Sequence, residues 1–204
     1  MHALILSTIL TLAIYPLNPI SEDTINALNA HVAFGVAAPN GVVDAGPELS
    51  ARLEASVAHP IIVRSSADFR VGSVSTRPWP EGSLLTTTIS TDLLYYRGTD
   101  KLTAYFGAGV LYALNAFDAD KDVLDSLYAL DGITDVRYEN STGFRLTVGL
   151  RFHASYSVEV AFARTGAGFI FDRRLSPTMF AFSRQKVSVN DARVSIGYLI
   201  PLRK

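Results

Sequence analysis

A histidine and a serine two positions apart could form a hydrolytic site in the stretch "HAS", His153 to Ser155. In such a pair the imidazole acts as general base and the hydroxyl as nucleophile. An activated nucleophile of this kind also needs a third group that orients the base, and the sequence does not supply one. The stretch also has the length of a tight turn. We therefore expect a turn that is not catalytic, with an enzyme as the less favoured alternative.

The acidic stretch "DADKD", residues 118–122, resembles the opening of a calcium-binding loop. Such a loop needs glycine at its sixth position and glutamate at its twelfth. This sequence has Val123 and Ala129 there, so we expect a solvated acidic loop, no metal and no cofactor. The next residues, "VLDSLYAL" (123–130), have the spacing of a short helix with one apolar side. That side would contain Val123, Leu124, Leu127, Tyr128 and Leu130.

The largest set of charged residues recurs at alternate positions along the chain. It holds six acids and six arginines: Glu48, Glu54, Asp68, Asp92, Glu159 and Asp191, with Arg52, Arg64, Arg70, Arg145, Arg151 and Arg193. If these side chains share a closed interior, each must pair or hold water, because an unpaired buried charge is very costly. The set then either fills the interior as a plug or exchanges partners to open a pore. We favour the plug, since small barrels are filled by their own side chains.

The elements that must position these charges are β-strands, because apolar and polar residues alternate with period two, as in "SARLEASV" (50–57). The apolar positions carry Phe, Tyr, Leu, Ile and Val on nearly every segment. We predict eight strands at about 31–38, 48–57, 61–74, 83–96, 102–114, 144–153, 156–164 and 189–202.

Glycines decide which side of the strands faces inward. They share the parity of the charges, at Gly35, Gly72, Gly107, Gly109, Gly149 and Gly197. Glycine weakens a strand exposed to solvent, but inside a narrow barrel it makes room for long side chains. Bulky apolar residues fit on the outside, facing lipid. We predict an all-β fold, an eight-stranded antiparallel up-and-down transmembrane β-barrel. A soluble lipocalin-like ligand binder, with the apolar parity inside, is the alternative.

The connections alternate between short and long. The short ones are 58–60, 97–101 and 153–156, and the long ones are 39–47, 75–82, 115–143 and 165–188. Outer-membrane barrels have short periplasmic turns and long extracellular loops. The order therefore predicts that both termini are periplasmic. Aromatic residues at the periplasmic ends of the strands predict an interfacial girdle of Tyr95, Tyr96, Phe152, Tyr156 and Tyr198.

The last and third long connections carry opposite charges. The last, 165–188, is basic and aromatic, and either pairs with the acidic third connection or contacts anionic lipopolysaccharide or a host surface. We favour the pairing. The single tryptophan, Trp79 in "RPWP", is expected to be exposed or at the membrane interface.

The N-terminus and the composition bear on location. Residues 1–21 contain an apolar run of signal-peptide length, so we assign 1–21 to a signal peptide with an uncertain cleavage site and 22–204 to the barrel. The chain has 18 basic and 19 acidic residues, so no overall positive charge attracts nucleic acid. With no cysteine, disulfides and cysteine-ligated metals are excluded.

The sequence resembles small eight-stranded outer-membrane β-barrels of the OmpA/OmpX-type or OmpW-like group. The resemblance rests on "YFGAGVLYAL" (105–114), "FRLTVGLRFHASYSVEVAF" (144–162) and "VSIGYLIPL" (194–202), and spans residues 31–202. It implies a monomer in the outer membrane of a Gram-negative cell, in contact with membrane lipid and lipopolysaccharide and inserted by the barrel-assembly machinery. The "HAS" pair also resembles that of lipid A deacylases, but lies on the periplasmic side of our topology.

Four functions follow from these observations. We favour a non-enzymatic barrel whose extracellular loops act in envelope integrity or surface interaction. A narrow, porin-like channel for small solutes is the second hypothesis. A lipid A-modifying enzyme and the soluble ligand binder are less favoured.

Overall fold

The computed structural model describes residues 28–40, 43–58, 60–75, 79–99, 101–153, 155–176 and 178–203. The predicted signal peptide, residues 1–21, lies outside these ranges and stays a prediction. One antiparallel sheet accounts for nearly all of the described chain. Its strands are β1 (Leu28–Asn40), β2 (Gly46–Ala58), β3 (Ile61–Val74), β4 (Gly82–Gly98), β5 (Leu102–Ala119), β6 (Ile133–Tyr138), β7 (Ser141–Phe152), β8 (Tyr156–Ser176) and β9 (Met179–Arg203), and its helix is α2 (Lys121–Asp131).

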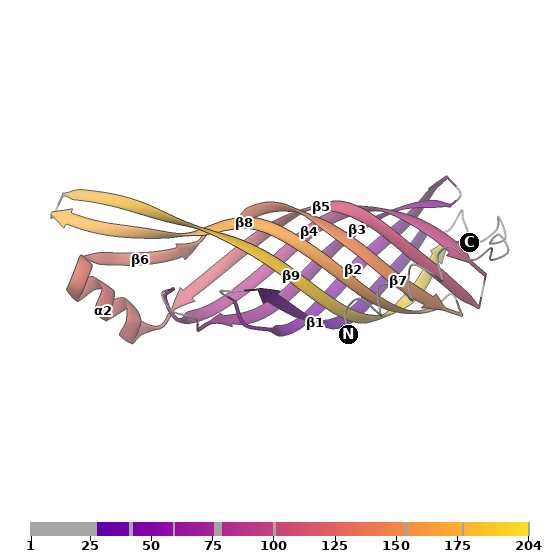
Figure 1. The fold of residues 1–204 in the computed structure, drawn as a ribbon, viewed down its shortest axis with the longest axis horizontal. Helices are drawn as coiled ribbons and strands as arrows, with labels where there is room; N and C mark the ends of the chain where they lie inside the picture. The colour runs from indigo at the N-terminus through magenta and orange to yellow at the C-terminus, as the bar shows by residue number, and fades with distance from the viewer. Residues whose placement is uncertain are drawn as a thin grey trace.

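The sheet closes into a ring (Figure 1). From β1 to β5 and from β7 to β9 each strand pairs with the next along the chain, β5 pairs with β7, and β1 pairs with β9 to complete the circle. Of the nine strands, β6 lies outside the ring and pairs only with β8, which leaves eight in the barrel. The predicted fold of eight antiparallel strands in up-and-down order is confirmed. No helix in the described ranges is long and apolar enough to cross a bilayer.

The alternation of side chains matches a barrel that is apolar outside and polar inside. Along β2, Arg52 and Glu54 are buried while Leu53 between them is 52% exposed. Bulky apolar side chains are exposed on every strand of the ring, including Phe34, Phe69, Ile89, Val110, Phe144, Phe162 and Ile196. The apolar parity therefore faces outward, which contradicts the soluble ligand binder with an apolar interior.

Two interior glycines make room for large neighbours, as the sequence predicts. A β-carbon at Gly149 would overlap the ring of Tyr105, and one at Gly197 would overlap the imidazole of His31. Both neighbours are almost completely buried. These glycines are thus needed for close approach within the lumen, not for an unusual backbone conformation.

The strands extend further than predicted at the end away from the termini. Residues 165–188 were expected to form a loop, but they continue β8 and β9 as a regular hairpin with its turn near Thr178. Residues 133–138, also expected in a loop, form β6. We call β6, α2 and the hairpin residues 165–188 the crown. Figure 1 shows the crown projecting from one end of the barrel, opposite the end at which Leu28 pairs with Arg203.

The prediction missed these extensions because the polarity of the two faces inverts where the crown begins. Within the barrel, β8 directs Glu159 inward and Phe162 outward; in the crown it directs Phe169 inward and Arg174 outward. The period of two continues, but the apolar residues change parity. A search for one fixed parity therefore ends β8 at the inversion. On β9 the apolar residues change parity at Val187 and Val189, whereas Phe180 and Phe182 near the turn face outward again.

We predict that Gly149→Ala will destabilise the barrel by about 1–3 kcal/mol, because the new methyl group forces Tyr105 out of its position in a packed lumen. The control is Ala108→Val on the lipid-facing side of β5, which should change stability by no more than about 0.5 kcal/mol. Equilibrium unfolding in urea, followed by gel mobility of unboiled samples, measures both. Equal effects of the two substitutions would contradict the assigned inside and outside.

Candidate functional site

The twelve charged residues singled out in the sequence all lie inside the barrel, and none is more than 9% exposed. Strands β2, β3, β4, β7, β8 and β9 supply them. Strands β1 and β5 supply none of the twelve and present small residues to the lumen, including Ala33, Gly35, Ala37, Gly107 and Gly109. Long charged side chains from six strands therefore extend toward the small residues on two others.

Arg64 is the central side chain of this set and has no exposed surface. Its guanidinium donates to Glu159 at 2.5 Å and to Asp92 at 3.3 Å. Glu159 also lies 3.1 Å from a guanidinium nitrogen of Arg52 and accepts a hydrogen bond of 3.0 Å from the hydroxyl of Tyr105. Three strands and an aromatic side chain thus meet at one carboxylate.

Glu54 links this centre to the end of the barrel near the termini. It accepts a hydrogen bond of 2.5 Å from Arg151 and one of 3.2 Å from the hydroxyl of Tyr96, and one of its oxygens lies 4.0 Å from Arg64. The Arg151 guanidinium lies over the Tyr96 ring, 4.8 Å from its centroid. The girdle assignment of Tyr96 is therefore wrong. Because Tyr95 faces outward, the alternation of a strand directs Tyr96 into the lumen.

Arg145 continues the network toward the crown. It donates to Asp68 at 2.7 Å and to Ser66 at 2.7 Å, and it also contacts Asp92, which it shares with Arg64. The serine and the two carboxylates come from β3 and β4, whereas Arg145 comes from β7. This arginine therefore joins two sides of the barrel through its whole guanidinium group.

Arg193 forms the layer nearest the crown. It lies 3.0 Å from Glu48, 3.1 Å from Asp68 and 3.1 Å from Asp191, and Arg70 donates to Asp191 at 2.8 Å. Because Asp68 is shared with Arg145, all twelve residues form one connected network along the lumen. It leaves little room, since the cavity found beside Arg70 and Asp191 in the described structure is about 30 Å³, space for one or two waters.

Sequence reasoning missed three uncharged members of the lumen, namely Tyr105, Tyr96 and His31. The His31 ring is 1% exposed, and its Nε2 lies 2.9 Å from the hydroxyl of Ser157. The alternation of side chains along a strand could have identified them. Each lies in a correctly predicted strand, at a position whose side chain points inward. Of the three, Tyr96 was assigned to the interfacial girdle by its residue type, whereas Tyr105 and His31 were given no position.

The other girdle residues and the "HAS" turn are placed as follows. Tyr95, Phe152, Tyr156 and Tyr198 are exposed on the outer wall near the end that carries the termini, and the rings of Tyr156 and Tyr198 are 5.3 Å apart. The hydroxyl of Ser155 donates to the main-chain carbonyl of His153, not to its imidazole. This arrangement does not activate the serine as a nucleophile.

The inner surface of the crown is an apolar cluster that covers the lumen. Its centre is Phe169, which has no exposed surface and stacks on Trp79 with ring centroids 5.2 Å apart. The expectation that Trp79 would be exposed or at the membrane interface is therefore wrong. Phe117 and Tyr138 pack edge-on against the same ring. Burial raises the pKa of Tyr138 to about 12, so its phenol stays protonated at neutral pH.

Helix α2 confirms the short helix predicted for residues 123–130. Leu124 and Leu127 pack against the apolar cluster, whereas Tyr128 and Leu130 are exposed. The expectation of a single apolar side that includes all five residues is thus only half right. Asp120 of the "DADKD" stretch immediately precedes the helix, and its main-chain N–H donates to the carbonyl of Glu81.

Ion pairs hold the crown together. Arg184 donates to Glu139 at 2.7 Å and Arg137 donates to Asp172 at 2.6 Å. Arg173 lies 3.4 Å from Asp131 at the end of α2. Each pair joins the last hairpin to residues of the third long connection. The predicted pairing between these two segments is therefore confirmed, although one of them is a hairpin and not a loop.

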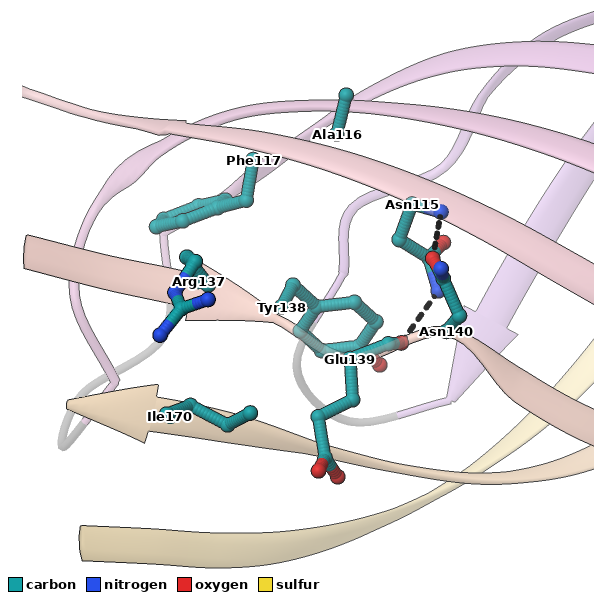
Figure 2. A pocket seen from close by; sticks show the side chains of 8 residues that line it. All are labelled: Asn115, Ala116, Phe117, Arg137, Tyr138, Glu139, Asn140 and Ile170. Carbon is teal, nitrogen blue, oxygen red and sulfur yellow. Dashed lines mark hydrogen bonds between the residues drawn. The ribbon is translucent and has the colours of Figure 1, made fainter. Parts of the chain in front are cut away.

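The wall has a break at the base of the crown. β5 pairs with β7 only as far as Ala113 and Ser141, and above this point β6 pairs with β8 and leaves β5. Asn115 bridges the break, because its main-chain N–H donates to the side-chain oxygen of Asn140 at 2.8 Å and its side-chain amide donates to the carbonyl of Glu139 at 2.7 Å. A cavity of about 490 Å³ lies here (Figure 2). Its lining is Asn115, Ala116, Phe117, Arg137, Tyr138, Glu139, Asn140 and Ile170.

We predict that Arg145→Met will cost about 3–5 kcal/mol of stability, because it deprives two buried carboxylates of a partner. The matched control is Arg137→Met in the crown, whose exposed ion pair is worth less than about 1 kcal/mol. Both are measured by urea unfolding in detergent, with the fluorescence of Trp79 and gel mobility as readouts. An equal, small effect at both sites would show that the network does not hold the barrel together.

The chain is similar to known proteins in its fold, not in its sequence. No protein-family model and no curated protein matches the sequence. Among solved structures, the outer membrane protein OprG from Pseudomonas aeruginosa matches with a TM-score of 0.63 and 15% identity, over 86% of this chain and 97% of that one. The outer membrane protein AlkL, solved in lipid bilayers, matches with a TM-score of 0.51 and 16% identity, over 93% and 97%. With its ring of eight strands, the chain has the fold of the small outer-membrane β-barrel proteins.

Proposed function

We propose that this protein resides in the outer membrane of a Gram-negative cell, with both termini in the periplasm, and acts at the cell surface through its crown. The apolar outer wall suits hydrocarbon, and the aromatic residues at the end near the termini suit a membrane interface. Exposed ion pairs lie on the outside of the crown, and β8 and β9 are too long to lie within the bilayer, because a spanning strand needs only about 9–11 residues. On this proposal its lipid partners are membrane lipid and lipopolysaccharide, its insertion uses the barrel-assembly machinery, and it acts as a monomer without enzymatic activity.

The observation that carries this proposal is that side chains fill the lumen. The network from Glu54 to Arg193 fills the bore, and the cluster around Phe169 covers one end of it. To pass a solute along this route, buried ion pairs would have to break together, and each broken pair leaves an uncompensated charge. A barrel of this kind is better suited to anchor a surface structure than to conduct.

We predict that the refolded protein gives no resolved channel openings in planar bilayers at neutral pH. A variant with Arg64→Ala and Tyr105→Ala removes two of the largest buried side chains and should give openings, provided that its unboiled gel band shows a closed barrel. Openings by the unaltered protein would overturn the proposal of a sealed anchor.

The break in the wall supports a second candidate, a passage for small solutes that leaves the barrel sideways. The cavity between β5 and β6 has about 490 Å³ of space. Its lining joins the polar groups of Asn115, Asn140 and Arg137 to the apolar side chains of Phe117 and Ile170. Such a mixture suits a small solute with both hydroxyl groups and apolar surface. The two hydrogen bonds of Asn115 would then act as the closure of the passage.

If this second function operates, the double variant Asn115→Cys and Asn140→Cys should block it when oxidised. The chain has no native cysteine, so the disulfide across the break is the one intramolecular disulfide that the variant can form, and thiol titration verifies it. Proteoliposomes carrying the variant should swell in isosmotic arabinose only after dithiothreitol is added. Asn115→Cys alone is the control and should swell under both conditions. Equal swelling of the oxidised and the reduced double variant would rule out this passage.

A further inference from the structure

The crown has one strand edge without a neighbour. β9 pairs with β1 only from Asn190 onward, whereas its pairing with β8 begins at Met179. Between Met179 and Val189, β9 therefore has a partner on one side only among the described residues. On that side the crown sheet is well formed, in the order β6, β8, β9. In Figure 1 the hairpin extends beyond the barrel with β9 along its margin.

The side chains beside this edge alternate between two kinds of environment. One face of the edge carries every second side chain of β9, because successive side chains of a strand point to opposite faces. These side chains are Phe180, Phe182, Arg184 and Lys186. Phe182 is 78% exposed and Phe180 is 64% exposed. On the other face, Val187 and Val189 are buried in the crown. The end of the edge nearest the barrel is thus fixed by the buried Val187 and Val189, while its outer face presents two aromatic and two basic side chains.

Exposed edges of this kind are unusual, because unpaired N–H and C=O groups act as a template for another strand. Natural proteins commonly shorten, bend or cover such an edge. Here the edge is long and lies in a regular ladder with β8, and its stretch "MFAFS" (179–183) carries no charge. A strand that adds to it would gain main-chain hydrogen bonds at once and side-chain contacts at every second residue.

We propose that this edge binds an extended acidic segment of a partner protein by strand addition. Cross-strand neighbours of opposite charge stabilise a sheet and like charges destabilise it. The partner should therefore place acidic residues opposite Arg184 and Lys186 and apolar residues opposite Phe180 and Phe182. Arg184 already uses its Nε on Glu139, but its side chain stays 49% exposed. Lys186 is exposed and forms no ion pair among the described residues.

The same charges argue against a second copy of this chain as the occupant. An antiparallel pair of two such edges that is centred on Arg184 sets Arg184 of one copy opposite Arg184 of the other, and a shift toward the barrel sets it opposite Lys186. A shift toward the hairpin turn sets Arg184 opposite Phe182, but this register gives up the pairing of residues 188 and 189. A parallel pair in register also brings the basic residues together. Like charges at these positions oppose self-association, so the edge is suited to a different, acidic chain.

This inference deepens the proposed function and rests on it, because it names the partner class of the crown. The probe is a synthetic peptide of alternating design, Thr-Glu-Thr-Glu-Thr-Val-Thr-Val-Thr, which in antiparallel register sets its glutamates against Lys186 and Arg184. Binding is measured by fluorescence anisotropy with the full chain in an uncharged detergent. Hydrogen exchange of the amides in residues 179–189 reports whether the peptide pairs with the edge.

We expect the peptide to bind and to slow exchange across residues 179–189. Lys186→Glu should weaken binding by about tenfold, because it replaces an attraction by a repulsion. The matched control is Arg174→Glu, which makes the same change of charge on the same face but on β8, the inner strand. It should change affinity by less than about threefold. Unboiled gel mobility verifies that both variants form closed barrels.

Three outcomes would overturn the inference. A peptide with lysine in place of glutamate could bind equally well, a peptide N-methylated at alternate residues could bind equally well, or the protein could sediment as a dimer through this edge. The first removes the charge preference, the second shows adsorption without strand pairing, and the third assigns the edge to a second copy. Channel openings by the unaltered protein would instead refute the sealed anchor, whatever the peptide does.

Discussion

The narrow bore of an eight-stranded ring is the constraint on which the rest of this structure depends. Once the strands close, every second side chain is confined to a space only just wide enough to be filled. The chain meets this constraint by alternating lengths around the ring. Arg64 and Arg145 extend across the lumen, and the small glycine and alanine residues on β1 and β5 leave space for these long side chains. The charges must then pair, because an unpaired buried charge is costly.

A network of this kind determines how the strands align with one another. Arg145 of β7 contacts carboxylates from β3 and β4, and Arg193 of β9 contacts carboxylates from β2, β3 and its own strand. A slip of one residue in any strand would move its charges to the lipid face. The main-chain ladder alone tolerates several registers, but the ion pairs across the lumen tolerate one. The buried charges therefore serve specificity of the fold as well as closure of the bore.

The sequence predicts the barrel well because a single physical rule governs it. Alternation located all eight ring strands, and it placed Leu53 outside and Arg52 inside without reference to any structure. The errors arose where a second rule competes. Tyr96 was assigned by residue type to the membrane interface, although its parity directs it inward to Glu54. The last hairpin was assigned to a loop because the apolar residues of β8 change parity where the crown begins.

That inversion also explains why the crown can be an independent functional unit. Below it, apolar residues face outward and the interior is charged. Above it, an apolar cluster around Phe169 forms the interior, and the outer face carries basic residues together with the exposed Phe180 and Phe182. One continuous sheet thus encloses two cores, a charged one in the barrel and an apolar one in the crown. As β8 and β9 leave the ring, β1 does not follow them, and the closure that removes strand edges within the ring is lost. A free edge on β9 is the geometric consequence of extending two strands of a closed barrel beyond the others.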